Sequence, residues 1–276
     1  MNDAARPALP APFQFSQSSL TDFEVCRRRF RLRWIERLEW PAPATTPGAQ
    51  PSLGQRFHRL MEQHFLGLDI GPLLAGAPAD APPRSWWDAF CRYPPPGLPA
   101  RAAYPELSLL APVEGHWLLA ELDLLAIDPG ERAVIIDWKT GSRPPALEVH
   151  AQSWQSCIYP YLLVEAGAPY NGGQPLAPAL VEMVYWFAEY PASPLRLTYG
   201  DEQHAANARR LRETIALIAS LPASAFNMCE DARPCLYCAY QTYCQRGAGL
   251  ARTDEEDETP AGDEKWDWAD VPEYAY

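Results

Sequence analysis

The sequence predicts an α/β protein in which a central mixed β-sheet is flanked by helices. The main observation is the order of the apolar patterns: helical periods come first, then three strand-like runs, a helix, two more strand-like runs and a last helix. The chain has 276 residues, of which 47% are hydrophobic, so one sizeable core can form. No apolar stretch approaches the roughly 18 residues that a membrane-spanning helix needs. We therefore expect a soluble, cytoplasmic protein without a membrane partner.

The N-terminal third is expected to be helical. Residues 16–40 place apolar side chains at helical spacing with arginines between them, and residues 52–69 repeat this spacing. A short helix is expected at 84–93. Residues 1–14 are rich in proline and alanine, and we expect them to be disordered.

The middle of the chain changes to the two-residue period of strands and then alternates with helices. Apolar runs broken by turns predict strands at 105–112, 115–129, 132–141, 180–190 and 194–200. Helical patterns follow at 147–167, where Pro160 should kink or end the helix, and at 202–221.

The negative charge is concentrated at the C-terminus. The net charge is −12, and residues 251–276 alone hold ten acidic and two basic residues. This tail is expected to be disordered, and it would leave one folded domain at 15–250. Because a separable tail dominates the balance, the acidic total does not exclude a nucleic-acid partner.

Three polar side chains in the middle strands form a pattern typical of metal chemistry. Asp137 and Lys139 are two residues apart in one expected strand and share a face, and a hairpin brings Asp123 beside them. Two neighbouring carboxylates repel each other unless a cation lies between them, and oxygen ligands favour Mg²⁺ or Mn²⁺. With a lysine to orient water or steady a phosphate, the set suits phosphodiester hydrolysis. The alternative is a solvated acid–base pair at a strand end.

Four of the seven cysteines lie in the stretch CEDARPCLYCAYQTYC, from Cys229 to Cys244. In a cytoplasmic chain, clustered thiols favour a metal site over disulfides. A zinc ribbon would use two Cys-x2-Cys pairs, and only Cys235 and Cys238 form one. Local spacing favours Cys229 as the fourth ligand, since a short loop closes easily. Cys91 and Cys157 have no cysteine neighbours in the sequence and are expected to be buried.

Five separate segments follow one another in the order of a known nuclease core. They are an opening helix with a single cysteine, Cys26; Gly54-x3-His58; Asp123 followed by Asp137-Trp138-Lys139-Thr140-Gly141; Gln155-x3-Tyr159; and Cys235-x2-Cys238-x5-Cys244. Together they resemble the PD-(D/E)XK nuclease superfamily, and within it the RecB-type exonuclease domains and CRISPR-associated adaptation nucleases. The resemblance covers about residues 15–246 and implies a restriction-endonuclease-like core. Two departures are Ala120 in place of a usual glycine and Pro160 after the tyrosine.

The resemblance also implies roles for individual residues. His58, Asp123, Asp137 and the Trp138 carbonyl would bind Mg²⁺ or Mn²⁺, and Lys139 would be the catalytic lysine. Gln155 and Tyr159 would face the DNA or the active centre from one helix face. Glu106 matches an acidic position before the Asp123 strand and is either an outer ligand or a solvated residue.

For the thiols, the resemblance implies a different partner from local spacing. Cys26 would complete a [4Fe–4S] site with Cys235, Cys238 and Cys244, which joins the two ends of the domain and leaves Cys229 as a spectator. Zinc, or no metal at all, remains the alternative. Arg27 and Arg28 are candidate DNA contacts beside this site.

The implied activity is that of a metal-dependent DNA nuclease. An exonuclease acting on single-stranded ends is expected, with a role in DNA repair, recombination or CRISPR adaptation. The alternative is a catalytically inactive DNA-binding or scaffold subunit of a helicase–nuclease complex. No Gly-x4-Gly-Lys-Ser/Thr motif is present, so unwinding would require a helicase or CRISPR partner.

Overall fold

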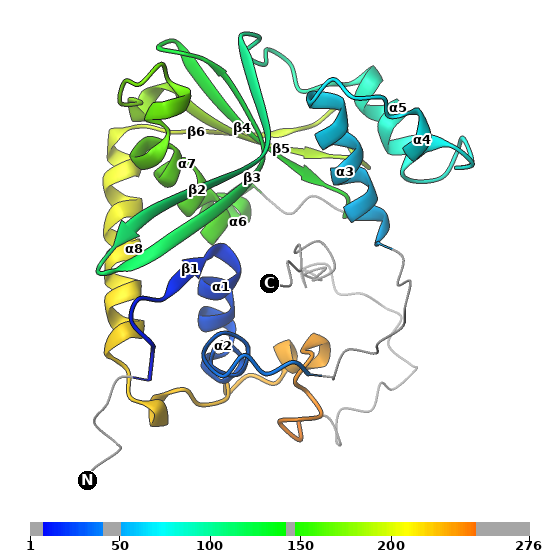
Figure 1. The fold of residues 1–276 in the computed structure, drawn as a ribbon. Coiled ribbons are helices and arrows are strands. Elements are labelled where there is room, and N and C mark those ends of the chain that lie inside the picture. Colours follow the sequence, from blue (N-terminus) through cyan, green and yellow to red (C-terminus); the bar gives the residue numbers. More distant parts are fainter. Residues whose placement is uncertain (1–7, 41–50, 142–146, 247–276) are drawn as a thin grey trace.

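A six-stranded mixed sheet forms the centre of the protein in the computed structural model, which describes residues 8–40, 51–141 and 147–246 (Figure 1). Its strands are β1 (Gln14–Ser16), β2 (Ala102–Val113), β3 (His116–Asp128), β4 (Arg132–Lys139), β5 (Val181–Phe187) and β6 (Leu195–Thr198). Hydrogen bonding connects them in the order β1-β3-β4-β5-β6, and β2 pairs with β3. The predicted central mixed sheet is confirmed.

Strand β3 organises this sheet because it has three neighbours. Along one edge it pairs with β2 in a long antiparallel hairpin. Along the other edge its first residues pair in parallel with β1, from Trp117 to Leu119, and its last residues pair antiparallel with β4, from Leu124 to Asp128. Between these two partners lies a short gap in the pairing, at the level of Asp123.

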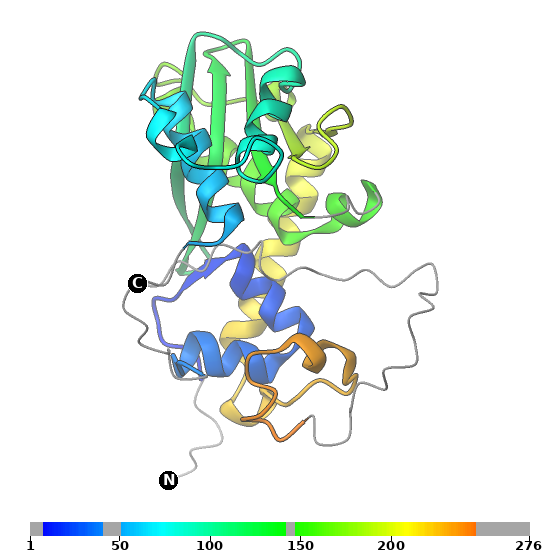
Figure 2. The same cartoon turned by 90° about the vertical axis from the view of Figure 1, so that its right-hand side faces the viewer.

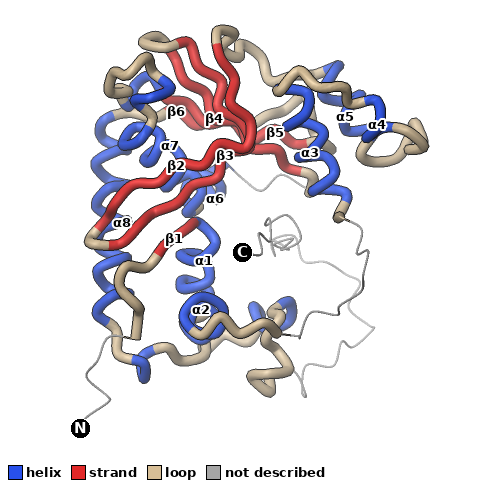
Figure 3. The backbone as a smooth tube through the Cα atoms, in the orientation of Figure 1, coloured by secondary structure: helices blue, strands red, loops and turns tan. Residues whose placement is uncertain are grey.

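Helices cover both faces of the sheet (Figure 3). One face carries the larger core, against α1 (Gln17–Val25), α7 (Trp154–Ala166) and α8 (Asp201–Ser220). The other carries a smaller, aromatic-rich core against α3 (Leu53–Phe65), α4 (Gly71–Leu74) and α5 (Arg84–Arg92). Alternation along β4 supplies both cores: Ala133 and Ile135 enter the first, while Val134, Ile136 and Trp138 enter the second.

The helix predicted at 16–40 is broken in the structure. It divides into α1, α2 (Arg27–Phe30) and a π-helical turn, η2 (Arg31–Ile35). The break falls at Cys26, whose extended backbone (φ −160°, ψ 110°) ends α1 and begins α2. Helical periodicity in the sequence cannot detect this break, because the apolar spacing continues across it.

The helix predicted at 147–167 is also divided, but not at the proline. α6 (Leu147–Gln152) ends before Ser153, whose side chain accepts a hydrogen bond from the Ser156 N–H and thereby caps α7. Pro160 lies inside α7, which continues to Ala166. The expectation that Pro160 ends the helix was wrong.

The two ends of the described chain lie together (Figure 2). Short 3-10 turns follow the main elements: η3 (Ala168–Tyr170), η4 (Pro178–Leu180), η5 (Ala223–Ala225) and η6 (Arg233–Tyr237). The Arg28 N–H donates to the Asn227 carbonyl over 3.0 Å, which joins α2 to the cysteine-rich segment 226–246. Residues 8–13 are described although disorder was expected there: Leu9 and Phe13 are buried.

Residues 1–7 and the acidic tail at 251–276 lie outside the described residues. Among the helices that the structure describes, none is long and apolar enough to cross a membrane.

Candidate functional site

Two carboxylates meet where strands β3 and β4 separate. The β3–β4 ladder ends at the pair Leu124 and Ile136, so the next residues along it are Asp123 and Asp137. The Trp138 N–H donates to Asp123 Oδ2 over 2.7 Å, in the position where a further ladder bond would form. Because N–H and C=O of one strand residue point to the same side, the Trp138 carbonyl also faces this edge.

Asp137 is held by a lysine and a glutamine. Lys139 Nζ lies 2.9 Å from Asp137 Oδ2 and donates to Gln155 Oε1 over 3.2 Å, while the Gln155 amide donates to Asp137 Oδ1. Asp137 and Gln155 are 3% and 8% exposed. Asp137 Oδ2 is buried against the Lys139 ammonium and, as a carboxylate oxygen, keeps a further lone pair for a cation.

A second group of ligands lies next to Asp123. His58, from α3, approaches Asp123 Oδ1 with its Nδ1 at 3.4 Å. With Glu106, from β2, they offer three ligand atoms that lie within 4.8 Å of one another, the one such group among the residues that the structure describes. The structure therefore brings Glu106 to the site, whereas Asp137 stands beside this group with Lys139.

Glu106 occupies this position at a cost in backbone strain. Its φ is +48°, in the left-handed region that disfavours a side chain, although it lies within strand β2. On either side the register is unchanged, with Pro105 opposite Leu124 and Leu107 opposite Leu122. Strain at a candidate site indicates that the surrounding structure requires this residue in this place.

The site holds charges of both signs. Burial alone would lower the pKa of His58, but the Asp123 carboxylate beside it, with Asp137 and Glu106, raises the pKa to about 9. Burial would raise the pKa of Asp123, yet His58 and the Trp138 N–H hold it below its ordinary value. Burial raises the pKa of Asp137 to about 6, against the pull of Lys139. A divalent cation could replace the proton that His58 carries here.

Helix α7 directs two predicted residues at this site. Gln155 contacts both Asp137 and Lys139, and Tyr159, one turn later, is 7% exposed and hydrogen-bonds with Gln155. Burial and the charges of Asp137 and Asp123 raise the pKa of Tyr159, so its hydroxyl stays protonated and can donate. Both side chains face the carboxylates rather than the solvent.

Lys139 also lies next to a cluster of side chains that the sequence did not indicate, formed by Tyr185, Ser156 and His150. Lys139 Nζ lies 5.6 Å above the ring of Tyr185, whose hydroxyl is 2.7 Å from Ser156 Oγ. The imidazole of His150 stacks on the ring of Tyr185, and the two ring centroids are 4.5 Å apart. The signal that could have found Tyr185 is its register: it is paired with Asp137 in the parallel β4–β5 ladder.

Five thiols line one small pocket between α2 and the segment 226–246, and they are those of Cys26, Cys229, Cys235, Cys238 and Cys244. The thiol of Cys229 hydrogen-bonds with those of both Cys26 and Cys235. Thus Cys26 joins the C-terminal cysteines as expected, while Cys229 is not set apart from them. Cys157 is buried as predicted, whereas Cys91 is exposed.

The spacing of these thiols bears on which metal group they fit. Four sulfurs bound to one zinc ion at about 2.3 Å lie only about 3.8 Å apart. Within the described part of the chain, no three of these sulfurs lie within 4.8 Å of one another. The thiols would therefore move closer together on binding one zinc ion, and thiolates bind zinc and iron–sulfur clusters alike.

The family model described as the PD-(D/E)XK nuclease superfamily matches residues 14–245, most of the chain. The chain belongs to the PD-(D/E)XK nuclease superfamily. Its mixed sheet with helices on both faces agrees with the restriction-endonuclease-like core of that superfamily. Membership indicates a nuclease that depends on divalent metal ions and acts on DNA, and the group of His58, Glu106 and Asp123 is a site of suitable chemistry.

Two solved structures have a distant resemblance to this superfamily member. The protein SSO0001 has 18% identity and a TM-score of 0.40, over 86% of this chain and 87% of the other. A protein from Eubacterium rectale named "Putative exonuclease" has 10% identity and a TM-score of 0.44, over 74% and 79% of the two chains. Scores and identities this low support no functional assignment by themselves. No curated protein sequence matches the chain significantly.

Proposed function

We propose that this superfamily member is a cytoplasmic, RecB-type DNA exonuclease that acts on single-stranded ends. One observation carries the proposal: Asp123 and Asp137 meet at the separation of β3 and β4, with the Lys139 ammonium 2.9 Å from Asp137. A solvated acid–base pair would not be buried in this way, and Asp137 is only 3% exposed. The cytoplasm keeps thiols reduced, which suits a chain whose cysteines are all free.

In this proposal, Mg²⁺ or Mn²⁺ is held by His58, Asp123, Asp137 and the Trp138 carbonyl, with Glu106 as an additional ligand. The bound ion would supply Lewis acidity and a more acidic water. Lys139 would steady the negative charge of the phosphate, since the Asp137 carboxylate raises its pKa and keeps it protonated. Gln155 would keep Asp137 and Lys139 in their relative positions.

Cleavage of labelled single-stranded DNA with Mn²⁺ tests this function. Lys139→Met and Asp137→Asn should each lose activity by at least about a hundredfold, since each removes a charge at the reacting phosphate. Glu131→Gln is the matched control, because Glu131 lies in the β3–β4 turn, at the opposite end of β4 from Lys139, and forms an exposed ion pair with Arg101. A wild type as inert as the two variants would support the scaffold alternative. Cleavage of circular single strands would contradict an exonuclease.

We further propose that Cys26, Cys235, Cys238 and Cys244 bind a [4Fe–4S] cluster. The presence of Cys26 at one pocket with the three C-terminal cysteines supports this set of ligands. Iron and sulfide analysis of protein purified without oxygen tests this. Cys26→Ser should lose iron, whereas Cys229→Ser and the exposed Cys91→Ser should keep it. Stoichiometric zinc in the wild type would contradict the cluster.

A helicase or CRISPR adaptation partner is proposed to supply unwound DNA. The sequence contains no Gly-x4-Gly-Lys-Ser/Thr motif, so the chain itself lacks this means of using ATP. Blunt duplex ends should therefore resist the isolated nuclease and be degraded after a helicase is added. Rapid degradation of blunt duplexes by the chain alone would contradict a need for such a partner.

A further inference from the structure

Three consecutive arginines follow Cys26, and their side chains point in different directions. Arg27 is exposed, and its guanidinium lies 5.2 Å from the centre of the Phe23 ring. Arg28 lines a neighbouring pocket together with Cys244, and its charge lowers the pKa of that thiol against the effect of burial. Arg29 lines the thiol pocket itself, and its charge acts on Cys238. Two of three adjacent positive charges therefore face the thiols.

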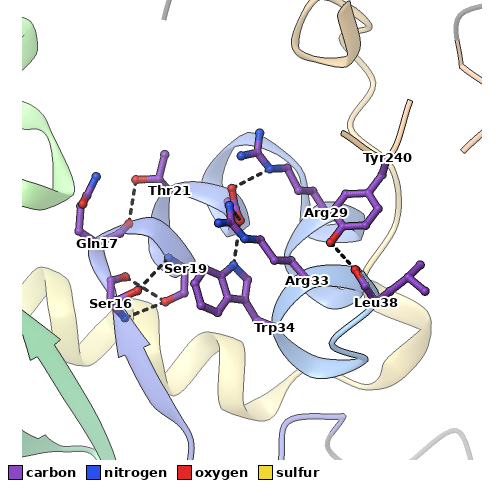
Figure 4. Close-up of polar contacts among 10 residues, drawn as sticks. Ser16, Gln17, Ser19, Thr21, Arg29, Arg33, Trp34, Leu38 and Tyr240 are labelled. Atoms are coloured by element: carbon purple, nitrogen blue, oxygen red, sulfur yellow. Dashed lines mark hydrogen bonds and ion pairs between the residues drawn. The ribbon is translucent and has the colours of Figure 1, made fainter. Parts of the chain in front are cut away.

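Arg29 is fixed by a buried carboxylate. Its Nε lies 2.7 Å from Asp22 Oδ1, and Asp22 is 1% exposed. The other oxygen of Asp22 accepts a hydrogen bond from Trp34 Nε1 over 2.8 Å and lies 3.5 Å from Arg33. In Figure 4 the side chains of Arg29, Arg33 and Trp34 converge on one point, with Tyr240 of the cysteine-rich segment next to Arg29.

A surplus of negative charge explains why a thiol pocket needs such neighbours. Four thiolates carry more negative charge than either a zinc ion or an oxidised iron–sulfur core offsets, so the loaded site is anionic. A nearby guanidinium stabilises the anionic site, and it stabilises a reduced cluster still more, because reduction adds an electron. Net charge and hydrogen bonds to the sulfurs are general determinants of cluster potential.

We propose that Arg28 and Arg29 compensate the charge of the thiol site and raise the reduction potential of its [4Fe–4S] cluster. The inference rests on the cluster proposed above and goes beyond it, since it assigns positioning residues that ligate no iron. Both act through their charges: Arg28 lies beside Cys244, and Arg29 lines the thiol pocket, where Asp22 holds it in place.

Redox titration of the full-length protein, followed by visible absorption, tests this inference. Arg28→Gln and Arg29→Gln should each make the cluster harder to reduce, by about tenfold in the reduction equilibrium, which is about 59 mV for a one-electron couple. Arg27→Gln is the matched control, since it removes the same charge from the same turn but from a side chain directed at Phe23. Its potential should equal that of the wild type.

Two more variants separate charge from packing. Arg29→Lys keeps the positive charge and should restore most of the potential lost in Arg29→Gln. Asp22→Asn removes a negative charge and leaves Arg29, so the potential should move in the positive direction. A negative shift in every variant, Arg27→Gln included, would overturn the inference, as would equal potentials in all of them. An iron-free wild type would instead overturn the cluster proposal itself, so the two failures are distinguishable.

Discussion

At the residue scale, Glu106 shows how a single strained backbone position shapes the candidate metal site. In each strand of the β2–β3 hairpin, every second residue faces the larger core, and this alternation shifts by one residue at the level of Glu106. In β2 the core-facing residues pass from Ala102 and Tyr104 to Leu109 and Ala111, and in β3 from Leu118, Ala120 and Leu122 to Leu125 and Ile127. A left-handed residue allows this change without altering the register. It also directs a carboxylate toward His58 and Asp123.

Replacing Glu106 should separate strain from function. Glu106→Gly should have a free energy of unfolding about 1 kcal/mol higher than Glu106→Gln, because only glycine relieves the positive φ. Both variants should bind Mn²⁺ more weakly than the wild type. Urea unfolding and calorimetric titration with Mn²⁺ in the absence of DNA measure the two effects. Glu114, with a φ of +50° in the β2–β3 turn, is the control: Gly should again exceed Gln in stability, with Mn²⁺ binding unchanged.

His150 predicts a pH dependence of stability. Burial, with the charge of Lys139, lowers its pKa from 6.5 to about 4. Because the unfolded state takes up the proton first, the stability that His150 contributes is complete above pH 6.5 and is lost as the pH falls toward 4. Between pH 7 and pH 5 the wild type should lose on the order of 1 kcal/mol more than His150→Phe, which keeps a ring on Tyr185. Urea unfolding at both pH values measures this, and an equal loss of free energy in the wild type and in His150→Phe would contradict it.

The candidate site was only partly predictable at this scale. Strand spacing placed Asp137 and Lys139 together, the family resemblance added Gln155, and the structure has all three in contact. The position of Asp137 apart from the group of His58, Glu106 and Asp123 could not be foreseen, because it depends on where β3 and β4 separate. Tyr185 could not be predicted for a similar reason, since it lies beside Asp137 only through the parallel pairing of β4 with β5.

At the element scale, helix α7 continues through an internal proline, and α8 contacts its backbone in the turn before that proline. Pro160 has no N–H to donate to the preceding turn. In that turn, Asn207 of α8 donates from Nδ2 to the Cys157 carbonyl over 3.0 Å, and Asn207 is 5% exposed. A side chain from a neighbouring helix thus satisfies a carbonyl near the proline. Sequence patterns treat the helix alone, which is why they allowed a kink or an end at Pro160.

Truncating Asn207 should therefore weaken both the helix and the site that it supports. Asn207→Ala leaves the buried Cys157 carbonyl without this donor and should lower the free energy of unfolding by about 1 to 3 kcal/mol. Cleavage should slow as well, because the same helix positions Gln155. Gln203→Ala, which removes an exposed partner of the Asn207 side chain, should cost less than about 0.5 kcal/mol. Equal losses in the two variants, measured by urea unfolding, would contradict this role of Asn207.

At the scale of the whole molecule, the order of the main strands and helices was predictable, but the N-terminal strand β1 was not. The sheet follows from alternation in β4 and β5, whose residues serve two cores at once. The N-terminal strand β1 contains only three residues and pairs with a strand 103 positions later, as in Gln14 with Trp117. So short a segment has no periodicity to recognise, and its partner is set by the folded sheet.

The cysteine-rich segment 226–246 depends on contacts with the N-terminal helices. Of its large apolar side chains, Phe226 and Tyr240 are buried, whereas Met228, Leu236, Tyr237 and Tyr243 are exposed. The Tyr240 hydroxyl donates to the Leu38 carbonyl over 2.8 Å, and the Trp40 indole donates to Thr242 over 3.0 Å. With so little buried apolar surface, a metal group shared by both ends would supply much of its stability.

Loss of that metal group should release the segment while leaving the sheet folded. A cross-link between Cys26 and Cys235 closes a loop of about 200 residues, which constrains the unfolded chain by up to about 5 kcal/mol. In Cys238→Ser, chymotrypsin should cut first after the exposed Tyr237 and Tyr243, and the thermal midpoint should fall by several degrees. Amides of β3 and β4 should nevertheless keep their protection from hydrogen exchange, because both cores lie on the sheet. Cys91→Ser, an exposed thiol outside the pocket, is the control. If both variants resist chymotrypsin equally, the segment is held by its direct contacts alone, and the shared thiol site contributes nothing to joining the two ends.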